Sequence, residues 1–342
     1  MAKMNFARRR VITGGIACGA GFGLMRIAPT NAFAQGAARQ RVSIVNAAGN
    51  INLVMQELMK QQRFLEDFGL EPEVANVADG SKMVGAILGG DVDCSTMSGF
   101  GQIFPAIERG AKLKIIAGAG LLPSLAVFTS KPAVQSLKDL EGRTVGTGSL
   151  GALLHQLVVA LLRKKGVDVS KVRFVNIGSS ADVFRATVVG TVDAGLGEVA
   201  VIDQAEKFKV RPVPGGNMAL ELPEYTFQGA WTSDRAIETK RDTLVRTLAA
   251  YAKLYRFTHK PEARERFLKA YLTVLKSGTQ DDAISMWDYV QRYKPYAENL
   301  TLTPERLRYM QQLNIDLDVQ KTIMPFERVA DMSLAQEALK LL

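Results

Sequence analysis

Short apolar stretches alternate with stretches of helical periodicity over the first two-thirds of the chain. RVSIVNA at 41–47 has the β-branched run typical of a strand, and the following segment repeats apolar residues every three or four positions before ending at Gly69. Two further short strands are predicted at 72–77 and 92–97, each reached through a predicted helix. Such alternation of strands and helices predicts an α/β fold with largely parallel sheets.

The same order of elements begins again about one hundred residues later. Strands are predicted at 143–149 and 172–177, with a strongly apolar helix between them at 150–166. The phrase AILGGDVD at 86–93 then has its counterpart in ATVVGTVD at 186–193, at an offset of 100 residues. This period is too long for a stack of small repeats, and five elements that match in order make chance the weaker explanation. The repeat therefore predicts two similar α/β lobes.

The last third of the chain has a different pattern. From about residue 234, four amphipathic stretches begin near Pro or Thr and predict helices without any strand among them. Their aromatic residues are interpreted as core positions or as a wall against one lobe; they include Trp287, Tyr289, Tyr293 and Tyr296.

Composition is that of a folded protein large enough for two domains. The chain has 342 residues, of which 47% are hydrophobic and 23% charged, and this balance argues against disorder. Its formal net charge is +9, but five of the 43 Lys and Arg residues lie within the first 34, which leaves 38 against 34 Asp and Glu. Because no later basic run with interleaved aromatic residues follows, no nucleic-acid partner is expected.

The first 34 residues predict an export signal. A basic region is followed by a Gly-rich apolar run that is too short for a membrane span, and then by NAFAQG, which predicts cleavage after Ala34. The run RRRVI at 8–12 matches a twin-arginine pattern. An ordinary secretory signal with a long basic region is the alternative. Either route predicts a periplasmic protein.

Few side chains suited to covalent catalysis are present. Cys94 is the single cysteine left after the predicted cleavage, so no intramolecular disulfide is expected, and its position after a strand predicts a small buried residue. His155 lies in an apolar helix, and His259 lies at a helix end, where it can act as a cap. No metal-ligand spacing, nucleophile elbow or phosphate-binding loop occurs. The sequence therefore predicts no metal and no cofactor.

Small polar residues gather in the loops that follow the predicted strands. Ligands of parallel α/β sheets bind beyond the carboxyl ends of strands, and helix N-termini there suit carboxylate, sulfonate or phosphate oxygens. Helix capping alone explains any single loop, but convergence of several favours a site. None of them contains Lys or Arg, so helix dipoles and hydroxyl groups would hold an anion, or the ligand is uncharged. The loops are 46–50, 79–81, 95–99, 147–149 and 178–180.

Over residues 41 to about 235, the chain resembles a known family. The phrases FLEDFGLEPEVANV, AILGGDVDCSTMSG and SLKDLEGRTVGTGS are similar to those of periplasmic solute-binding proteins of ABC transporters, of the nitrate, sulfonate and taurine type. That family also contains receptors for pyrimidine vitamin precursors and aromatic acids. The resemblance implies a two-lobed, Venus-flytrap fold of the type II periplasmic-binding class, with two hinge crossings and C-terminal helices.

The resemblance also implies where the lobes and the cleft lie. Crossings near 129–130 and near 230–231 would give one lobe of 36–129 plus 231–342 and a second lobe of 130–230. Val199 stands after Glu198 where many relatives have Pro, which leaves the role of Glu198 open. Trp231 is either a cleft wall or a buried hinge residue. The implied ligand-binding residues are Asn46, Ala47, Ser95, Thr96, Ser98, Gly148, Ser149, Glu198 and Trp231.

The function implied by the resemblance is capture of a small solute and its delivery to a membrane permease. The expected solute is anionic, similar to a sulfonate, nitrate or carboxylate, and the expected protein is a monomer without enzymatic activity. An enzyme of the same fold that acts on a pyrimidine or other vitamin precursor is the alternative, as is a receptor for a different transporter class. The export signal and the scarcity of His and Cys disfavour the enzyme.

Overall fold

The computed structural model describes residues 39–77 and 80–342, without the side chain of Ser81. The predicted export signal, its cleavage site after Ala34 and Asp79 of the 79–81 loop lie outside the described residues.

The first sheet has five strands in the order β2-β1-β3-β10-β4. β1 (Gln40–Ala47) pairs in parallel with β2 (Leu70–Val77) and β3 (Cys94–Ser98). β10 (Gly229–Ser233) runs antiparallel between β3 and β4 (Leu113–Gly118). The connecting helices are α1 (Asn50–Gln62), α2 (Phe64–Asp67), α3 (Gly80–Gly89) and α4 (Ile103–Glu108).

The second sheet repeats this arrangement in the order β7-β6-β8-β5-β9. β6 (Thr144–Thr147) pairs in parallel with β7 (Arg173–Asn176) and β8 (Ala194–Glu198), while β5 (Leu125–Thr129) runs antiparallel to β8 and β9 (Arg211–Asn217). Its connections are η1 (Leu137–Leu140), α5 (Leu153–Lys164), η2 (Val169–Lys171), α6 (Ser180–Val188), η3 (Val199–Phe208) and α7 (Met218–Glu221). We refer to the parts around the two sheets as the first and second lobes.

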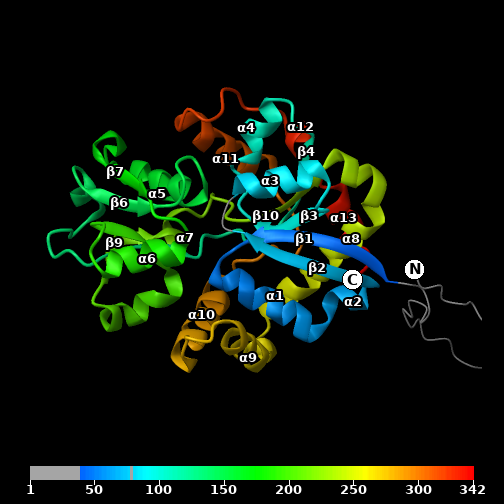
Figure 1. The fold of residues 1–342 in the computed structure, drawn as a ribbon, viewed down its shortest axis with the longest axis horizontal. Helices are drawn as coiled ribbons and strands as arrows, with labels where there is room; N and C mark the ends of the chain where they lie inside the picture. Colours follow the sequence, from blue (N-terminus) through cyan, green and yellow to red (C-terminus); the bar gives the residue numbers. More distant parts are fainter. Residues whose placement is uncertain (1–38, 78–79) are drawn as a thin grey trace, which may run out of the picture. The chain divides into compact units, whose positions relative to one another are not determined.

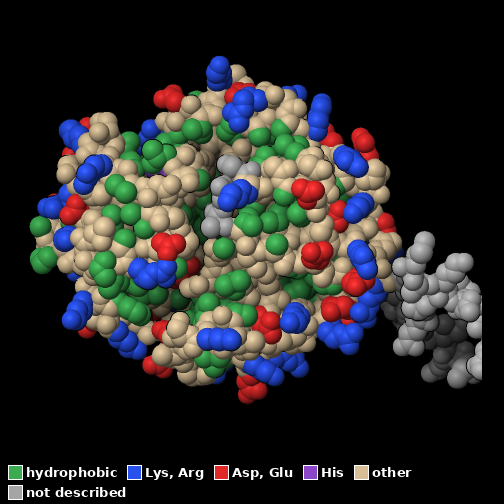
Figure 2. Space-filling view, in the orientation of Figure 1, with side chains coloured by type: hydrophobic (Ala, Val, Ile, Leu, Met, Phe, Trp, Pro, Cys, Tyr) green, Lys and Arg blue, Asp and Glu red, His purple; other side chains and the backbone are tan. Residues whose placement is uncertain are grey.

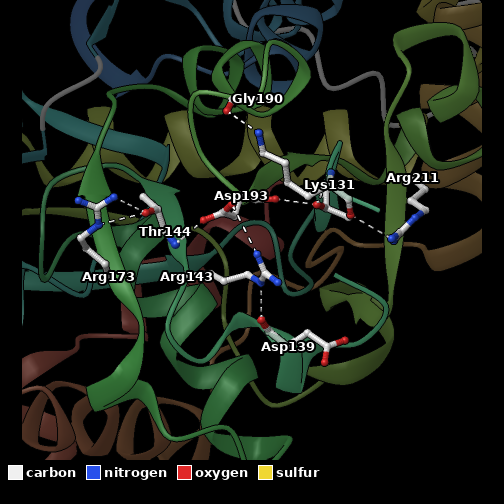
Figure 3. A network of polar contacts seen from close by, with 9 residues as sticks. Lys131, Asp139, Arg143, Thr144, Arg173, Gly190, Asp193 and Arg211 are labelled. Carbon is white, nitrogen blue, oxygen red and sulfur yellow. Dashed lines mark hydrogen bonds and ion pairs between the residues drawn. The ribbon is translucent and has the colours of Figure 1, made fainter. Parts of the chain in front are cut away.

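The repeated aspartates occupy equivalent places in the two lobes. Asp93 Oδ2 accepts a hydrogen bond from the backbone N–H of Ser43 at 2.9 Å, and Asp193 Oδ2 accepts one from Thr144 at 2.9 Å. Each carboxylate therefore ties the start of one strand, β3 or β8, to the parallel strand beside it, β1 or β6. Figure 3 shows the Asp193 network, in which Arg143 lies within 4.0 Å of the carboxylate. The repeat thus encodes scaffold.

The chain crosses between the sheets earlier than the sequence predicts. β4 ends in the first sheet and β5 begins in the second, so the first crossing lies within 119–124 rather than at 129–130. The return crossing lies within 222–228, between α7 and β10. The reason is that an apolar strand pattern does not reveal the sheet to which the strand belongs. The backbone pairing of Leu125 with Glu198 decides it.

The C-terminal helices contact both lobes (Figure 1). α10 packs on η3, where Gln204 Nε2 donates to Ser285 Oγ at 2.8 Å, and α11 packs on α5, where Gln156 hydrogen-bonds Asn314. The described residues accordingly form one compact unit. These helices are α8 (Asp234–Thr258), η4 (Pro261–Ala263), α9 (Arg264–Val274), α10 (Gln280–Tyr293), α11 (Pro304–Asp316), α12 (Phe326–Val329) and α13 (Ser333–Leu339).

No strand follows β10 within residues 234–342, in agreement with the helical pattern of that region. Trp287, Tyr289 and Tyr296 are buried, as the amphipathic spacing predicts. Across the described part of the chain, no helix combines the length and the apolar character that a membrane crossing requires.

Candidate functional site

A cleft of about 750 Å³ lies between the two lobes (Figure 2). Parallel strands of each lobe point their carboxyl ends toward it, because Ala48 and Gly148, directly after β1 and β6, line its wall, as do Asn176 and Glu198, the last residues of β7 and β8. All five polar loops singled out in the sequence reach this cleft through at least one residue, and these include Ala47, Gly80, Gly99, Gly148 and Gly178. The structure therefore brings the loops together at one place.

Two helices, one from each lobe, begin at the cleft without a capping side chain. The N-cap residue of α1 is Gly49 and that of α5 is Ala152, and neither makes a side-chain cap hydrogen bond. The backbone N–H groups of both first turns are consequently available, together with the positive end of each helix dipole. An anion in the cleft would find donors from both lobes.

The N-terminus of α6, in contrast, is explained by capping. Ser179 Oγ accepts from the backbone N–H of Asp182 at 3.2 Å, and the Asp182 carboxylate accepts from the Ser179 N–H at 3.2 Å. This reciprocal pair satisfies two donors of the first turn. Ser179 and Ser180 line the cleft, but the first of them already has its partners.

Four of the nine predicted site residues line the cleft. Ala47 ends β1, Gly148 and Ser149 follow β6, and Glu198 ends β8. Ser149 is exposed, and its Oγ accepts a hydrogen bond from Asn176 Nδ2 at 3.4 Å. These placements agree with the implied cleft; contact with a ligand stays a prediction.

The other five predicted residues do not line the cleft. Asn46 is fully buried, and its Oδ1 accepts hydrogen bonds from the N–H of Thr96 at 2.9 Å, from Thr96 Oγ1 at 3.1 Å and from the N–H of Met97 at 2.7 Å. Ser98 Oγ accepts from Trp231 Nε1 at 2.8 Å and contacts Ser95 Oγ. These side chains tie β1, β3 and β10 together below the cleft.

The sequence placed these residues in a loop because their side chains are polar, whereas β3 keeps Ser95 to Ser98 within the buried sheet. The strand continues through Ser98 in a fully buried sheet, so the part of this loop that faces the cleft begins at Gly99. Trp231 has no exposed surface, which makes it a buried residue near the return crossing rather than a cleft wall.

Other cleft residues were missed by the sequence reasoning. Asn52 Nδ2 donates to the carbonyls of Ala47 at 2.8 Å and Met97 at 3.0 Å, while its Oδ1 accepts from Gln228 Nε2 at 3.0 Å. A signal for Asn52 existed, because it is a polar residue on the apolar face of α1. Nothing in the local pattern signals Asn314, which reaches the cleft from α11.

Charge in the cleft wall is sparse. The charged lining residues among those described are Arg109, Glu198 and Asp318. Arg109 directly follows α4 and is exposed, whereas Glu198 is half-buried. Desolvation by the surrounding protein raises the pKa of Glu198 to about 7 from an ordinary value of 4.5. Glu198 therefore titrates close to neutral pH.

Replacing Glu198 with glutamine is expected to change how stability depends on pH. The folded state holds the Glu198 proton between about pH 4.5 and about 7, where the unfolded state has released it, so the stability of the wild-type protein falls as pH rises through this window. Above pH 7, we expect the unfolding free energy of Glu198→Gln to exceed that of wild type by up to roughly 3 kcal/mol, an upper limit because water in the cleft lowers the cost of the charge. Below about pH 4, we expect the two proteins to be equally stable. Urea unfolding at several pH values measures this difference.

The exposed residue Glu262 supplies the control for that experiment. We expect Glu262→Gln to follow the wild-type pH profile. A Glu198→Gln profile that also coincides with wild type at every pH would contradict the desolvated state of Glu198.

Neither histidine nor the described cysteine lines the cleft. His155 is buried beneath it, where Nδ1 accepts from the Gly151 N–H at 3.1 Å, and burial lowers the pKa of this imidazole. His259, at the end of α8, has its Nδ1 2.6 Å from Oε1 of Glu298, which lies between α10 and α11. Cys94 is buried in β3, and desolvation raises the pKa of its thiol far above the ordinary value. Among the described residues, no group of His, Cys, Asp and Glu is arranged to hold a metal ion.

Two lobes of identical strand order, joined by two crossings around one cleft, define the periplasmic-binding-protein fold. The family model described as NMT1/THI5 like matches residues 58–264, which is more than half of the chain, and the protein belongs to this family. Among curated protein sequences, none matches the chain.

Solved structures of low sequence identity share the fold. The periplasmic aliphatic sulphonate binding protein SsuA from Escherichia coli has 16% identity and a TM-score of 0.69, covering 85% of this chain and 92% of its own. The alkanesulfonate-binding protein SsuA from Xanthomonas axonopodis pv. citri, bound to MOPS, has 17% identity and a TM-score of 0.67, covering 89% and 99%. The desulfurization enzyme DSZB has 14% identity and a TM-score of 0.62, covering 89% and 99%.

Proposed function

We propose that the protein is the extracytoplasmic solute-binding component of an ABC uptake transporter and that its solute is a small organic anion. One observation carries this proposal: α1 and α5 begin on opposite sides of the cleft without capping side chains. The two SsuA proteins of the same fold are named for sulfonate binding, which supports a sulfonate-like or carboxylate-like solute.

The dimensions of the cleft favour an organic solute over an inorganic ion. Its volume of about 750 Å³ is in the range that accommodates drug-sized molecules, far larger than nitrate needs. Apolar side chains line a large part of the wall, among them Pro105, Leu125, Leu153 and Phe227. We infer a solute with an anionic group at the helix N-termini and a carbon body against these residues.

Uptake in this proposal needs no covalent chemistry. Closure of the lobes brings the N-terminal turn of α5 toward that of α1 and strengthens the contacts of both turns with the anion. The solute therefore binds the closed state more tightly than the open state and stabilises the closed state. A membrane permease would then recognise the closed form and release the solute. The predicted export signal supports a periplasmic location, and a monomer would suffice because both lobes belong to one chain.

An enzyme remains the second candidate, because DSZB shares the fold. The chemistry of the described cleft disfavours it. The Cys94 thiol is buried and desolvated, which keeps it protonated and unreactive, and both histidines pack elsewhere. Among the described cleft residues, Glu198 has a pKa raised to about 7, which would suit proton transfer.

Thermal-shift screening of the purified protein tests the proposal. The panel contains alkanesulfonates, aminoalkanesulfonates, nitrate, aromatic carboxylates and pyrimidines. We expect an organic anion at a hundredfold excess over its Kd to raise the Tm by about 5 °C, because binding to the folded state alone adds about 2.7 kcal/mol. If no member of the panel raises the Tm, solute capture loses its support; if a pyrimidine without an anionic group does so, the solute class is wrong.

A further inference from the structure

The turn before α5 is held by a side chain that lies behind the cleft wall. This turn, residues 149–151, lines the cleft, and it closes where the Ala152 N–H donates to the Ser149 carbonyl at 3.0 Å. The N–H of Gly151 donates to His155 Nδ1 at 3.1 Å. Because His155 itself does not line the cleft, its ring anchors the turn from the protein side.

The His155 ring is suited to accept this hydrogen bond. Only 9% of the residue is exposed, and its ring meets that of Phe174 edge to face, with 4.8 Å between the ring centroids. Burial lowers the pKa of the imidazole, and the positive charge of Arg163 lowers it further, so the ring is neutral near pH 7. Its proton then lies on Nε2, which leaves Nδ1 as the acceptor.

The position of His155 in the helix leaves the first-turn donors of α5 available. His155 is the third residue of α5, from which a side chain can reach back to the backbone before the helix. In α6 the third residue, Asp182, does this together with the N-cap side chain of Ser179, which takes up a first-turn N–H. In α5 the N-cap residue is Ala152, which has no such group. The turn is therefore fixed while the N–H groups of the first turn remain available to an anion.

The first lobe has an equivalent arrangement. Asn52 is the third residue of α1, whose N-cap residue is Gly49. Asn52 Nδ2 donates to the Ala47 carbonyl at 2.8 Å, so a buried polar side chain again holds the backbone just before an uncapped helix. One lobe uses a donor and the other an acceptor, but both act from the third helical position. This recurrence favours a role in shaping the two helix ends that border the cleft.

We propose that His155 is the positioning residue of the anion contact in the second lobe: its Nδ1 holds the 149–151 turn so that the first-turn N–H groups of α5 face the solute. This inference rests on the proposed function, in which those groups bind the anionic end of the solute. Without the acceptor, the Gly151 N–H can turn to water in the cleft, and the turn in front of α5 loses its fixed position. Ordering the turn again on binding lowers the affinity.

Two substitutions separate the acceptor from the packing of the ring. His155→Asn places its Oδ1 directly on Cγ, as Nδ1 is, and so keeps the acceptor but loses the ring. His155→Phe keeps a ring against Phe174 but has no acceptor. We expect His155→Phe to weaken the binding of butanesulfonate or benzoate about tenfold at an unchanged Tm, and His155→Asn to keep the wild-type Kd at a lowered Tm. A role in packing alone predicts the reverse order of the two affinities, and that result would overturn the inference.

Hydrogen exchange of the Gly151 amide, followed by NMR, tests the anchor without any solute. We expect this amide to be protected in wild type and in His155→Asn, and to exchange on the order of tenfold faster in His155→Phe. Equal exchange in the two variants would overturn the inference. Unchanged affinity of His155→Phe for a probe that binds the wild-type protein would also overturn it while leaving the proposed function intact. Failure of both probes to bind the wild-type protein would overturn it too, and the thermal-shift panel then decides the proposed function separately.

Discussion

Replacing Asn46 with leucine is expected to destabilise the protein by roughly 3–5 kcal/mol. The fully buried Asn46 Oδ1 accepts three hydrogen bonds from Thr96 and Met97. Leucine has a similar size but removes the acceptor for two backbone N–H groups of β3 in a site closed to water, and each such loss costs about 1–3 kcal/mol; the Thr96 hydroxyl keeps its contact with Tyr251. Urea unfolding measures the free energy, with the slope of the transition as a check on two-state behaviour.

Asn176 provides the control for this substitution. It ends β7 much as Asn46 lies near the end of β1, but its side chain is exposed and makes one long hydrogen bond, to Ser149. We expect Asn176→Leu to change the unfolding free energy by less than about 0.5 kcal/mol. A loss below about 1 kcal/mol in Asn46→Leu would show that the three hydrogen bonds do not hold the cleft floor.

Replacing Ala48 with tryptophan is expected to weaken solute binding by at least roughly 100-fold. Ala48 is exposed on the cleft wall, directly before the N-terminus of α1. An indole there occupies the space in front of the free N–H groups and obstructs the approach of the two lobes, while no core residue has to move. Calorimetry with the solute found in the thermal-shift panel measures the change in Kd.

The matched control places the same side chain outside the cleft. Ala133 is an exposed residue that does not line the cleft, so Ala133→Trp should bind as wild type does. Both variants should unfold at the wild-type Tm. Wild-type affinity in Ala48→Trp would mean that the solute does not occupy the space before α1.

The sequence predicts most of the fold because the signals involved are local. A buried strand, an amphipathic helix and the glycine that ends it each have their own pattern over a few residues. The offset of 100 residues between Ala86 and Ala186 adds the one long-range fact that a single sequence can carry, namely that two lobes share their topology. Asp93 and Asp193 confirm it at the level of single hydrogen bonds.

The remaining features depend on contacts between distant segments. β5 is an apolar strand like β4, and its pairing with β8 and β9 assigns it to the second lobe. The polar residues of β3 suggest a loop. In the fold, Asn46 and Trp231, which lie far from β3 in the sequence, form hydrogen bonds with Thr96 and Ser98 and so allow these polar groups to be buried.

Equilibrium dialysis, followed by chemical analysis of the recovered solute, tests the role of the cleft most directly. We expect one organic anion per chain to bind reversibly, to be displaced by a competing solute and to return chemically unchanged. Ala48→Trp should abolish this retention. Conversion of the solute into a product, or retention that Ala48→Trp leaves intact, would contradict solute capture in the interlobe cleft.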